Sequence, residues 1–139
     1  MDGSLVCFLG AILIVGIFIF VAIILTQKRG HNFDVTAYQT RFLNIENSLK
    51  KDSPATYNMA IVEADKLLDK ALCELGIAGK TMGERLKKSS SRFSKINSVW
   101  HAHKLRNQIA HESGFQVEYM QATHALTIYK QALKDLGAI

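Results

Sequence analysis

Cysteine, proline and strand-type alternation are all scarce in this sequence. Only two cysteines and one proline occur among 139 residues. Cys7 lies in an apolar run and Cys73 in a helical pattern, so we expect no disulfide framework. We therefore expect the protein to be in a reducing compartment. No segment alternates apolar and polar residues with a period of two, as half-buried strands do. These absences favour an all-helical protein.

Two familiar site motifs are also missing. The run Gly79–Thr81 resembles the end of a phosphate-binding loop, but the pattern G-x-x-x-x-G-K-[ST] requires glycine where Glu74 stands. His101 and His103 are two residues apart, about 200° around a helix, so they cannot bind one metal ion together. We therefore expect no phosphate-binding loop, no metal site and no cofactor.

A long apolar run stands near the N-terminus. The 21 residues from Leu5 to Leu25 contain no charge, proline or amide. As a helix they would measure about 31 Å, which matches the hydrocarbon thickness of a bilayer. A cleaved signal peptide would need a charged leading region and a small-residue cleavage site, whereas the flank here is Met-Asp-Gly-Ser. The sequence predicts an uncleaved single-pass anchor over residues 1–27.

Charge predicts the orientation of this anchor. Lys28, Arg29 and His31 follow the span, while the N-terminal flank offers only the α-amino group and Asp2. Positive flanks stay in the cytoplasm, so the N-terminus should lie outside and residues 28–139 should form a cytoplasmic domain at the cytoplasmic membrane. All 17 lysines and arginines and 11 of the 12 acidic residues follow the span, which leaves a formal charge of +6 there. Such a domain suits an anionic lipid surface or a polyanion such as RNA.

The remaining residues follow the helical period. Apolar residues recur three and four positions apart, and capping signals precede them: Ser53 stands before Pro54, and Thr81 stands three residues before Glu84. The predicted helices cover residues 34–49, 54–75, 81–88, 94–112 and 113–136. Four longer helices and one short helix with short connections favour an antiparallel bundle. The expected fold class is all-α, with one transmembrane helix followed by this bundle.

Charges alternate along the second helix of the predicted bundle. Glu63, Asp65 and Asp69 stand beside Lys66 and Lys70. Opposite charges three or four residues apart on a helix form solvated ion pairs. We therefore expect these five residues to lie on a solvated face and to carry no chemistry.

One segment places polar residues on an apolar face. At 100° per residue, Arg106 falls near the centre of the face formed by Ile96, Val99, Ala102, Leu105, Ile109 and Ala110. A guanidinium there is costly unless it is paired or lines a cleft. Asn107 and His111 share one edge of the helix, with His103 one turn earlier. From the residues alone, Arg106 is either a structural ion, bonded to a buried carboxylate or helix-end carbonyls, or part of a site.

The run Leu105-Arg106-Asn107-Gln108-Ile109-Ala110-His111 resembles the signature of HEPN domains, in which an Arg is followed after four to six residues by a His. The resemblance implies a helical bundle over residues 34–137, a homodimer whose two motifs share a cleft and, in active members, a metal-independent endoribonuclease. It implies that Arg106 stabilises phosphate charge, that His111 is the general acid/base and that Asn107 helps to place the RNA. The chain also resembles small bacterial proteins that join an N-terminal anchor to such a bundle.

Two features qualify the resemblance. Glu112, Ser113 and Gly114 follow His111, so the His-x-Tyr extension of some toxin members is absent. Many HEPN-like domains are non-catalytic and serve as nucleotide-binding or assembly modules. The alternative function is therefore a non-catalytic helical module that dimerises or holds a partner at the membrane.

The chemistry of RNA cleavage fits these residue types. Attack by a ribose 2′-OH needs a group that titrates near neutral pH and a cation that stabilises the phosphorane, and His and Arg supply both. Basic residues just upstream are candidates for binding the RNA backbone, although they also suit a solvated face near an acidic membrane. These predicted RNA-binding residues are Lys87, Lys88, Arg92, Lys95 and Lys104.

Overall fold

The structure, a computed structural model, describes residues 2–26 and 32–139 and contains only helices among them. The chain divides into two compact units between Asn32 and Phe33. The predicted all-α class, with an apolar N-terminal helix followed by a bundle, is confirmed.

The first unit contains a single helix, α1 (Gly3–Thr26). From residue 3 to residue 23 every side chain is exposed, and most of them are large and apolar. Because α1 is apolar all round rather than along one stripe, it has no polar face to turn toward water. By length and composition it is able to cross a membrane. The residues that predict its orientation, Lys28, Arg29 and His31, lie outside the described residues.

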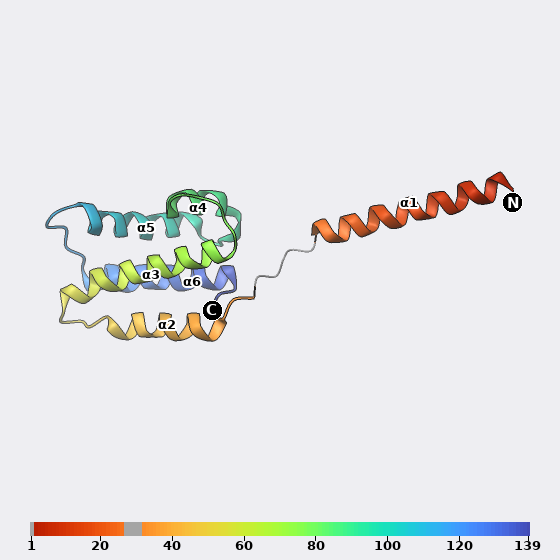
Figure 1. The fold of residues 1–139 in the computed structure, drawn as a ribbon. Coiled ribbons are helices and arrows are strands. Elements are labelled where there is room, and N and C mark those ends of the chain that lie inside the picture. Colours follow the sequence, from red (N-terminus) through yellow and green to blue (C-terminus); the bar gives the residue numbers. More distant parts are fainter. Residues whose placement is uncertain (1, 27–31) are drawn as a thin grey trace. The chain divides into compact units, whose positions relative to one another are not determined.

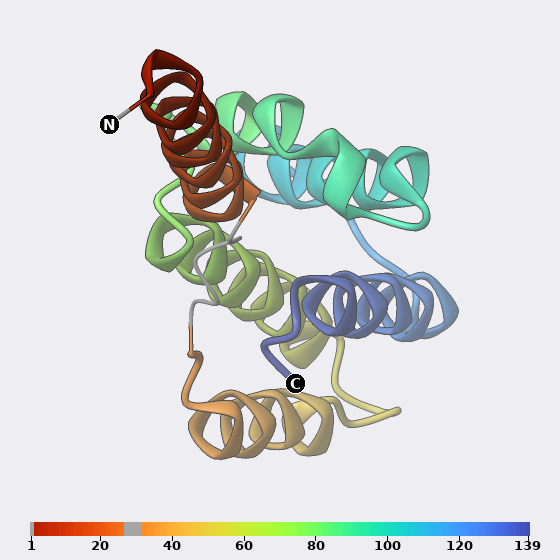
Figure 2. The ribbon, with the colours of Figure 1, turned by 90° about the vertical axis from the view of Figure 1, so that its right-hand side faces the viewer.

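The second unit is a bundle of four long helices with one short helix. Its elements are α2 (Val35–Ser48), α3 (Pro54–Glu74), α4 (Met82–Lys88), a 3₁₀ turn (Ser90–Arg92), α5 (Ile96–His111) and α6 (Tyr119–Leu136). Helices α3 and α6 lie in the middle, with α2 on one side and α5 on the other (Figures 1 and 2). Long helices that follow each other in the chain run in opposite directions, as predicted, whereas α3 and α6 run in the same direction (Figure 1).

The two predicted capping residues, Ser53 and Thr81, begin α3 and α4, and Asp34 caps α2. The Asp34 carboxylate accepts a hydrogen bond from the Ala37 N–H at 3.0 Å and caps α2. Ser53 is the N-cap of α3 and is followed by proline. The Thr81 hydroxyl accepts from the Glu84 N–H at 3.2 Å and caps α4. The side-chain acceptors of Asp34 and Thr81 satisfy backbone donors that have no partner within the helix, whereas Ser53 forms no side-chain cap hydrogen bond among the described residues.

The predicted start of the last helix, at residue 113, is wrong. Helix α5 ends at His111, Gly114 has a left-handed φ of +79° that a helix does not contain, and α6 begins only at Tyr119. Glu118 and Gln121 form the capping box of α6. Between the two helices Val117 is buried, so the connection packs onto the core instead of extending the helix.

Helix α3 is the centre of the core. It packs against α2, α4, α5 and α6, and nine of its residues are buried. The largest fully buried apolar side chains of the bundle are Phe42, Ile61, Leu67, Leu68, Leu72, Leu86, Tyr129 and Leu133. Burying each such side chain stabilises a fold by roughly 1.5–3 kcal/mol relative to exposure. A polar group on the buried face of α3 therefore lies among side chains of the neighbouring helices.

Candidate functional site

A cavity of about 650 Å³ opens beside α3, α4 and α5. Arg106, Asn107 and His111, the three residues predicted to be catalytic, all line it. Its other lining residues are Asp65, Lys66 and Asp69 of α3, Lys80 to Gly83 and Arg85 at the start of α4, and Trp100 and His103 of α5. The cavity therefore collects most of its polar side chains from helices that are far apart in sequence.

Asp65 is the most deeply buried of these polar residues. Its side chain is 5% exposed, so the prediction that it lies on a solvated face is wrong. Its Oδ1 accepts a hydrogen bond from the Tyr129 hydroxyl at 2.9 Å and lies 2.9 Å from Nδ1 of His103, within hydrogen-bond distance. Asp65 follows Ala64 on the face that packs against α5 and α6, where only paired polar groups are tolerated. One carboxylate thus joins three helices.

Arg106 lies between Asp65 and the cavity. Its Nε is 3.4 Å from Asp65 Oδ2, an ion-pair distance, and it forms no hydrogen bond among the described residues. Its Nη1 donates to Oδ1 of Asn107 at 3.2 Å. The side chain is 29% exposed, so it is neither sealed in the core nor free in solvent. Arg106 is paired with a carboxylate of its own bundle and also faces the cavity, so both interpretations of this residue keep physical support.

His111 is the last residue of α5 and differs from His103 in its surroundings. It is exposed, and no described side chain bonds its ring. His103 is buried and held by Asp65. Both line the same cavity.

The part of the cavity lining at the start of α4 depends on Arg85. Its Nε and Nη2 donate to the two carboxylate oxygens of Asp69 at 2.7 and 2.8 Å, and its Nη1 donates to the Gly79 carbonyl. The hydrogen bonds with Asp69 raise the pKa of Arg85, which keeps the guanidinium charged. A Cβ on Gly79 would lie 2.9 Å from Cγ of Arg85, so this close approach requires glycine. Asp69 is thus partly exposed and ion-paired, but its partner is Arg85 of α4 and not one of the lysines beside it in sequence.

Trp100 supplies the aromatic surface of the cavity. Its ring packs over Gly83, where an added Cβ would be 3.7 Å away, and it meets the His103 ring edge to face at 6.1 Å between centroids. The side chain remains partly exposed. Exposed aromatic rings of this kind can stack with nucleobases.

The predicted RNA-binding residues do not line this cavity. Lys87, Lys88, Arg92, Lys95 and Lys104 are all exposed, and none of them forms an ion pair within the described residues. Lys95 lines a separate pocket between α5 and α6. These cations lie outside the cavity, so their role in binding RNA stays a prediction.

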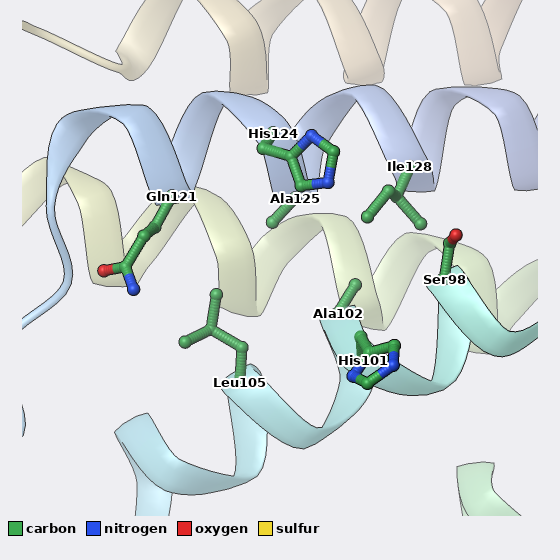
Figure 3. A pocket seen from close by; sticks show the side chains of 8 residues that line it. All are labelled: Ser98, His101, Ala102, Leu105, Gln121, His124, Ala125 and Ile128. Carbon is green, nitrogen blue, oxygen red and sulfur yellow. The ribbon is translucent and has the colours of Figure 1, made fainter.

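A second, smaller groove of about 230 Å³ separates α5 from α6 (Figure 3). Its floor is apolar, and His101 of α5 and His124 of α6 flank it (Figure 3). His101 and His103 thus line different pockets, as their angular separation on a helix predicts. Within the described residues no group of three or more His, Cys, Asp or Glu side chains is arranged to hold a metal ion.

Comparisons with known proteins give no further guide. No protein-family model, curated protein or solved structure matches the chain.

Sequence reasoning missed two groups of the site, Asp65 and Tyr129, and did not assign a role to His103. A usable signal was present: Asp65 shares the face of α3 that carries Ile61, Leu68 and Leu72. A carboxylate on an apolar face requires donors from elsewhere in the fold. The lysines beside it in sequence point to other faces and obscured that signal.

Proposed function

We propose that residues 28–139 form a HEPN-like, metal-independent endoribonuclease domain that α1 anchors in a membrane. The observation that carries this proposal is the convergence of Arg106, Asn107 and His111 on one cavity. These are the three residues that the HEPN-like motif singles out. If the motif were only part of a solvated surface, its three residues would not need to line the same cavity.

The chemistry assigns one role to each residue. The guanidinium of Arg106 keeps N–H donors beyond the contacts to Asp65 and Asn107, and these can stabilise the charge on a phosphorane. His111 transfers a proton, because an imidazole titrates near neutral pH. Asn107 fixes one edge of the guanidinium and helps to place the substrate.

The charges around the cavity suit a polyanion. Four cations, Lys66, Lys80, Arg85 and Arg106, line it with two carboxylates, Asp65 and Asp69. Each carboxylate is already paired with an arginine of the same cavity. The phosphates of RNA would therefore meet Lys80 and the exposed lysines outside the cavity first.

A second candidate is a non-catalytic interaction module. The 3.4 Å pairing of Arg106 with the buried Asp65 favours it, because such a pair can serve packing alone. In that role the bundle would dimerise or hold a partner at the membrane without cleaving RNA. The two candidates differ in what the loss of His111 should do.

The placement at the membrane has two parts. Helix α1 is able to span a bilayer. The positive flank of Lys28 and Arg29 orients the bundle toward the cytoplasm. A reporter fused after Ile139 should be active only in its cytoplasmic form, and an extracytoplasmic signal would contradict both the orientation and the RNA-cleaving role. The proposed assembly is a homodimer in which two copies of the motif face one cleft.

The function is tested with the full chain in detergent micelles or nanodiscs, assayed on single-stranded RNA in EDTA. His111→Ala should lower the cleavage rate by about 10²–10⁴-fold, the usual contribution of a general acid or base. His124→Ala, an exposed histidine outside the cavity, is the matched control and should cleave like the wild type. A folded dimeric wild-type protein that leaves RNA intact would contradict the nuclease and favour the interaction module.

A further inference from the structure

The buried histidine of the cavity is held more precisely than the histidine of the motif. Nδ1 of His103 is 2.9 Å from Oδ1 of Asp65, and the ring is buried. Its other nitrogen, Nε2, forms no hydrogen bond among the described residues. His103 also lines the cavity that contains Arg106 and His111. An imidazole fixed at one nitrogen and unbonded at the other is suited to proton transfer.

The partners of Asp65 determine which nitrogen carries the proton. The same Oδ1 accepts from the Tyr129 hydroxyl at 2.9 Å, and Arg106 lies beside Oδ2. Burial, followed by the charge of Asp65, raises the pKa of Tyr129 well above its ordinary value, so this hydroxyl keeps its proton and donates it. An ionised carboxylate cannot donate, so Nδ1 of His103 must be the donor. The lone pair is then on Nε2.

Cleavage of RNA by its own 2′-OH needs two proton transfers. One group removes the 2′-OH proton, and another protonates the departing 5′-oxygen. His103 and His111 are eight residues apart on α5, a rise of about 12 Å, with Arg106 between them. Two imidazoles on either side of a guanidinium can serve the two oxygens of one phosphodiester.

We propose that His103 is the general base of the site, with Asp65 and Tyr129 as its positioning residues and His111 as the general acid. This assignment rests on the proposed nuclease function and deepens it. Nε2 of His103 accepts the 2′-OH proton as the 2′-oxygen attacks phosphorus. The bond from phosphorus to the 5′-oxygen breaks, and His111 donates its proton to that oxygen. The products are a 2′,3′-cyclic phosphate and a free 5′-OH, with no water, oxidant or metal consumed.

The charge of Asp65 supports this order of roles. When His103 accepts a proton, the adjacent carboxylate stabilises the imidazolium that forms, as in other Asp–His pairs. His111 has no such partner among the described residues. Other charged or titratable groups line the same cavity as His103 or bond its partner Asp65. They are Lys66 and Asp69 of α3, Lys80 and Arg85 at the start of α4, Arg106 of α5 and Tyr129 of α6.

The test compares two substrates, an ordinary oligoribonucleotide and one with a bridging 5′-phosphorothiolate at the cleaved bond. A thiolate departs without protonation, so the second substrate does not need the general acid. His103→Asn keeps an N–H donor near the position of Nδ1 and removes Nε2. It should lower cleavage of both substrates by about 10²–10⁴-fold. His111→Ala should be slow on the ordinary substrate and close to wild type on the phosphorothiolate.

The control is His101→Asn, on the same helix but in the other groove, which should cleave both substrates like the wild type. A second variant, Tyr129→Phe, keeps the buried ring and removes one donor from Asp65. The less stabilised carboxylate then favours the imidazolium of His103, so the acid limb of the pH–rate profile should move to higher pH. A merely structural Tyr129 would lower stability without moving that limb.

The outcomes separate the two proposals. A wild-type protein that cleaves RNA, with a folded His103→Asn variant equally active, would overturn only the role of His103. Rescue of His103→Asn but not of His111→Ala by the phosphorothiolate would also overturn it, since the roles would be exchanged. If His103→Asn does not fold, an unmoved pH limb in Tyr129→Phe overturns the assignment. A folded wild-type protein that cleaves neither substrate overturns both proposals.

Discussion

Asp65 and Asp69 lie one turn apart on α3, line the same cavity and each pair with an arginine, but they do so in opposite ways. The Asp65 side chain is 5% exposed and is bound by residues of α5 and α6, with Arg106 at 3.4 Å. The Asp69 side chain is 28% exposed and receives two short, parallel hydrogen bonds from Arg85 alone. The better ion-pair geometry belongs to the more exposed residue.

Burial determines what each carboxylate contributes. Removing one partner of a buried pair leaves a charge that water cannot reach, whereas water replaces a lost partner at the surface. Asp65 therefore couples three helices at the base of the cavity, and Asp69 fixes only the start of α4. The buried, multiply bonded Asp65 is the better placed of the two carboxylates to position a group that transfers a proton.

The largest effect should come from Asp65→Ala. It leaves the Tyr129 hydroxyl and the His103 Nδ1 without an acceptor and the Arg106 guanidinium without its counter-charge. We expect the free energy of unfolding to fall by about 3–5 kcal/mol. Denaturant titrations followed by circular dichroism measure this. Asp69→Ala is the matched control and should lose about 1 kcal/mol or less; equal losses would remove the distinction between the two carboxylates.

Arg106→Ala should have an intermediate effect. Asp65 would keep two hydrogen-bond donors, and the side chain that is lost is partly exposed, so we expect a loss of about 1–3 kcal/mol. His111→Ala should leave the melting temperature unchanged, because the ring is exposed. Thermal melts and RNA cleavage are measured on the same samples. Full stability in Arg106→Ala would show that the pair with Asp65 contributes nothing to the fold.

The sequence predicted the helices better than it predicted the base of the cavity, and the reason is physical. Capping and periodicity are local, so Asp34, Ser53 and Thr81 begin helices where their side chains indicate. The start of α6 was misplaced because a left-handed Gly114 and a buried Val117 are tertiary features.

The candidate site divides in the same way. The motif on α5 gave Arg106, Asn107 and His111, which share a cavity. The contacts of Asp65 join residues 38 and 64 positions apart in the chain, and no local pattern specifies such contacts. Spacing along one helix therefore predicts Arg106, Asn107 and His111, whereas the contacts of Asp65 depend on packing between helices.

The Asp69 side of the comparison can be sharpened with Arg85→Lys. A lysine keeps the charge but cannot form the two parallel hydrogen bonds or reach the Gly79 carbonyl at the same time. Because Asp69 is partly exposed, the loss should be only about 0.5–1 kcal/mol. Chemical denaturation at low and high salt measures it. A loss as large as that of Asp65→Ala would mean that α4 is as tightly coupled to the core as α5.

The smallest expected effect concerns Asp135, a partly exposed carboxylate that is bonded to the segment before α5. Burial raises its pKa, but hydrogen bonds from the Ser94 backbone N–H, the Gln131 amide and the Ser94 hydroxyl outweigh this and lower the pKa below the ordinary value of 3.8. A lowered folded-state pKa stabilises the fold above the unfolded-state value, and this contribution is lost as the pH falls through the folded-state pKa. Asp135→Asn should therefore flatten the acid side of the curve of stability against pH. Ser94→Ala removes one of the three bonds and should flatten it less. An acid slope that Asp135→Asn leaves unchanged would assign the acid sensitivity to other carboxylates, of which Glu63, with a pKa lowered by Lys66, is the next to replace.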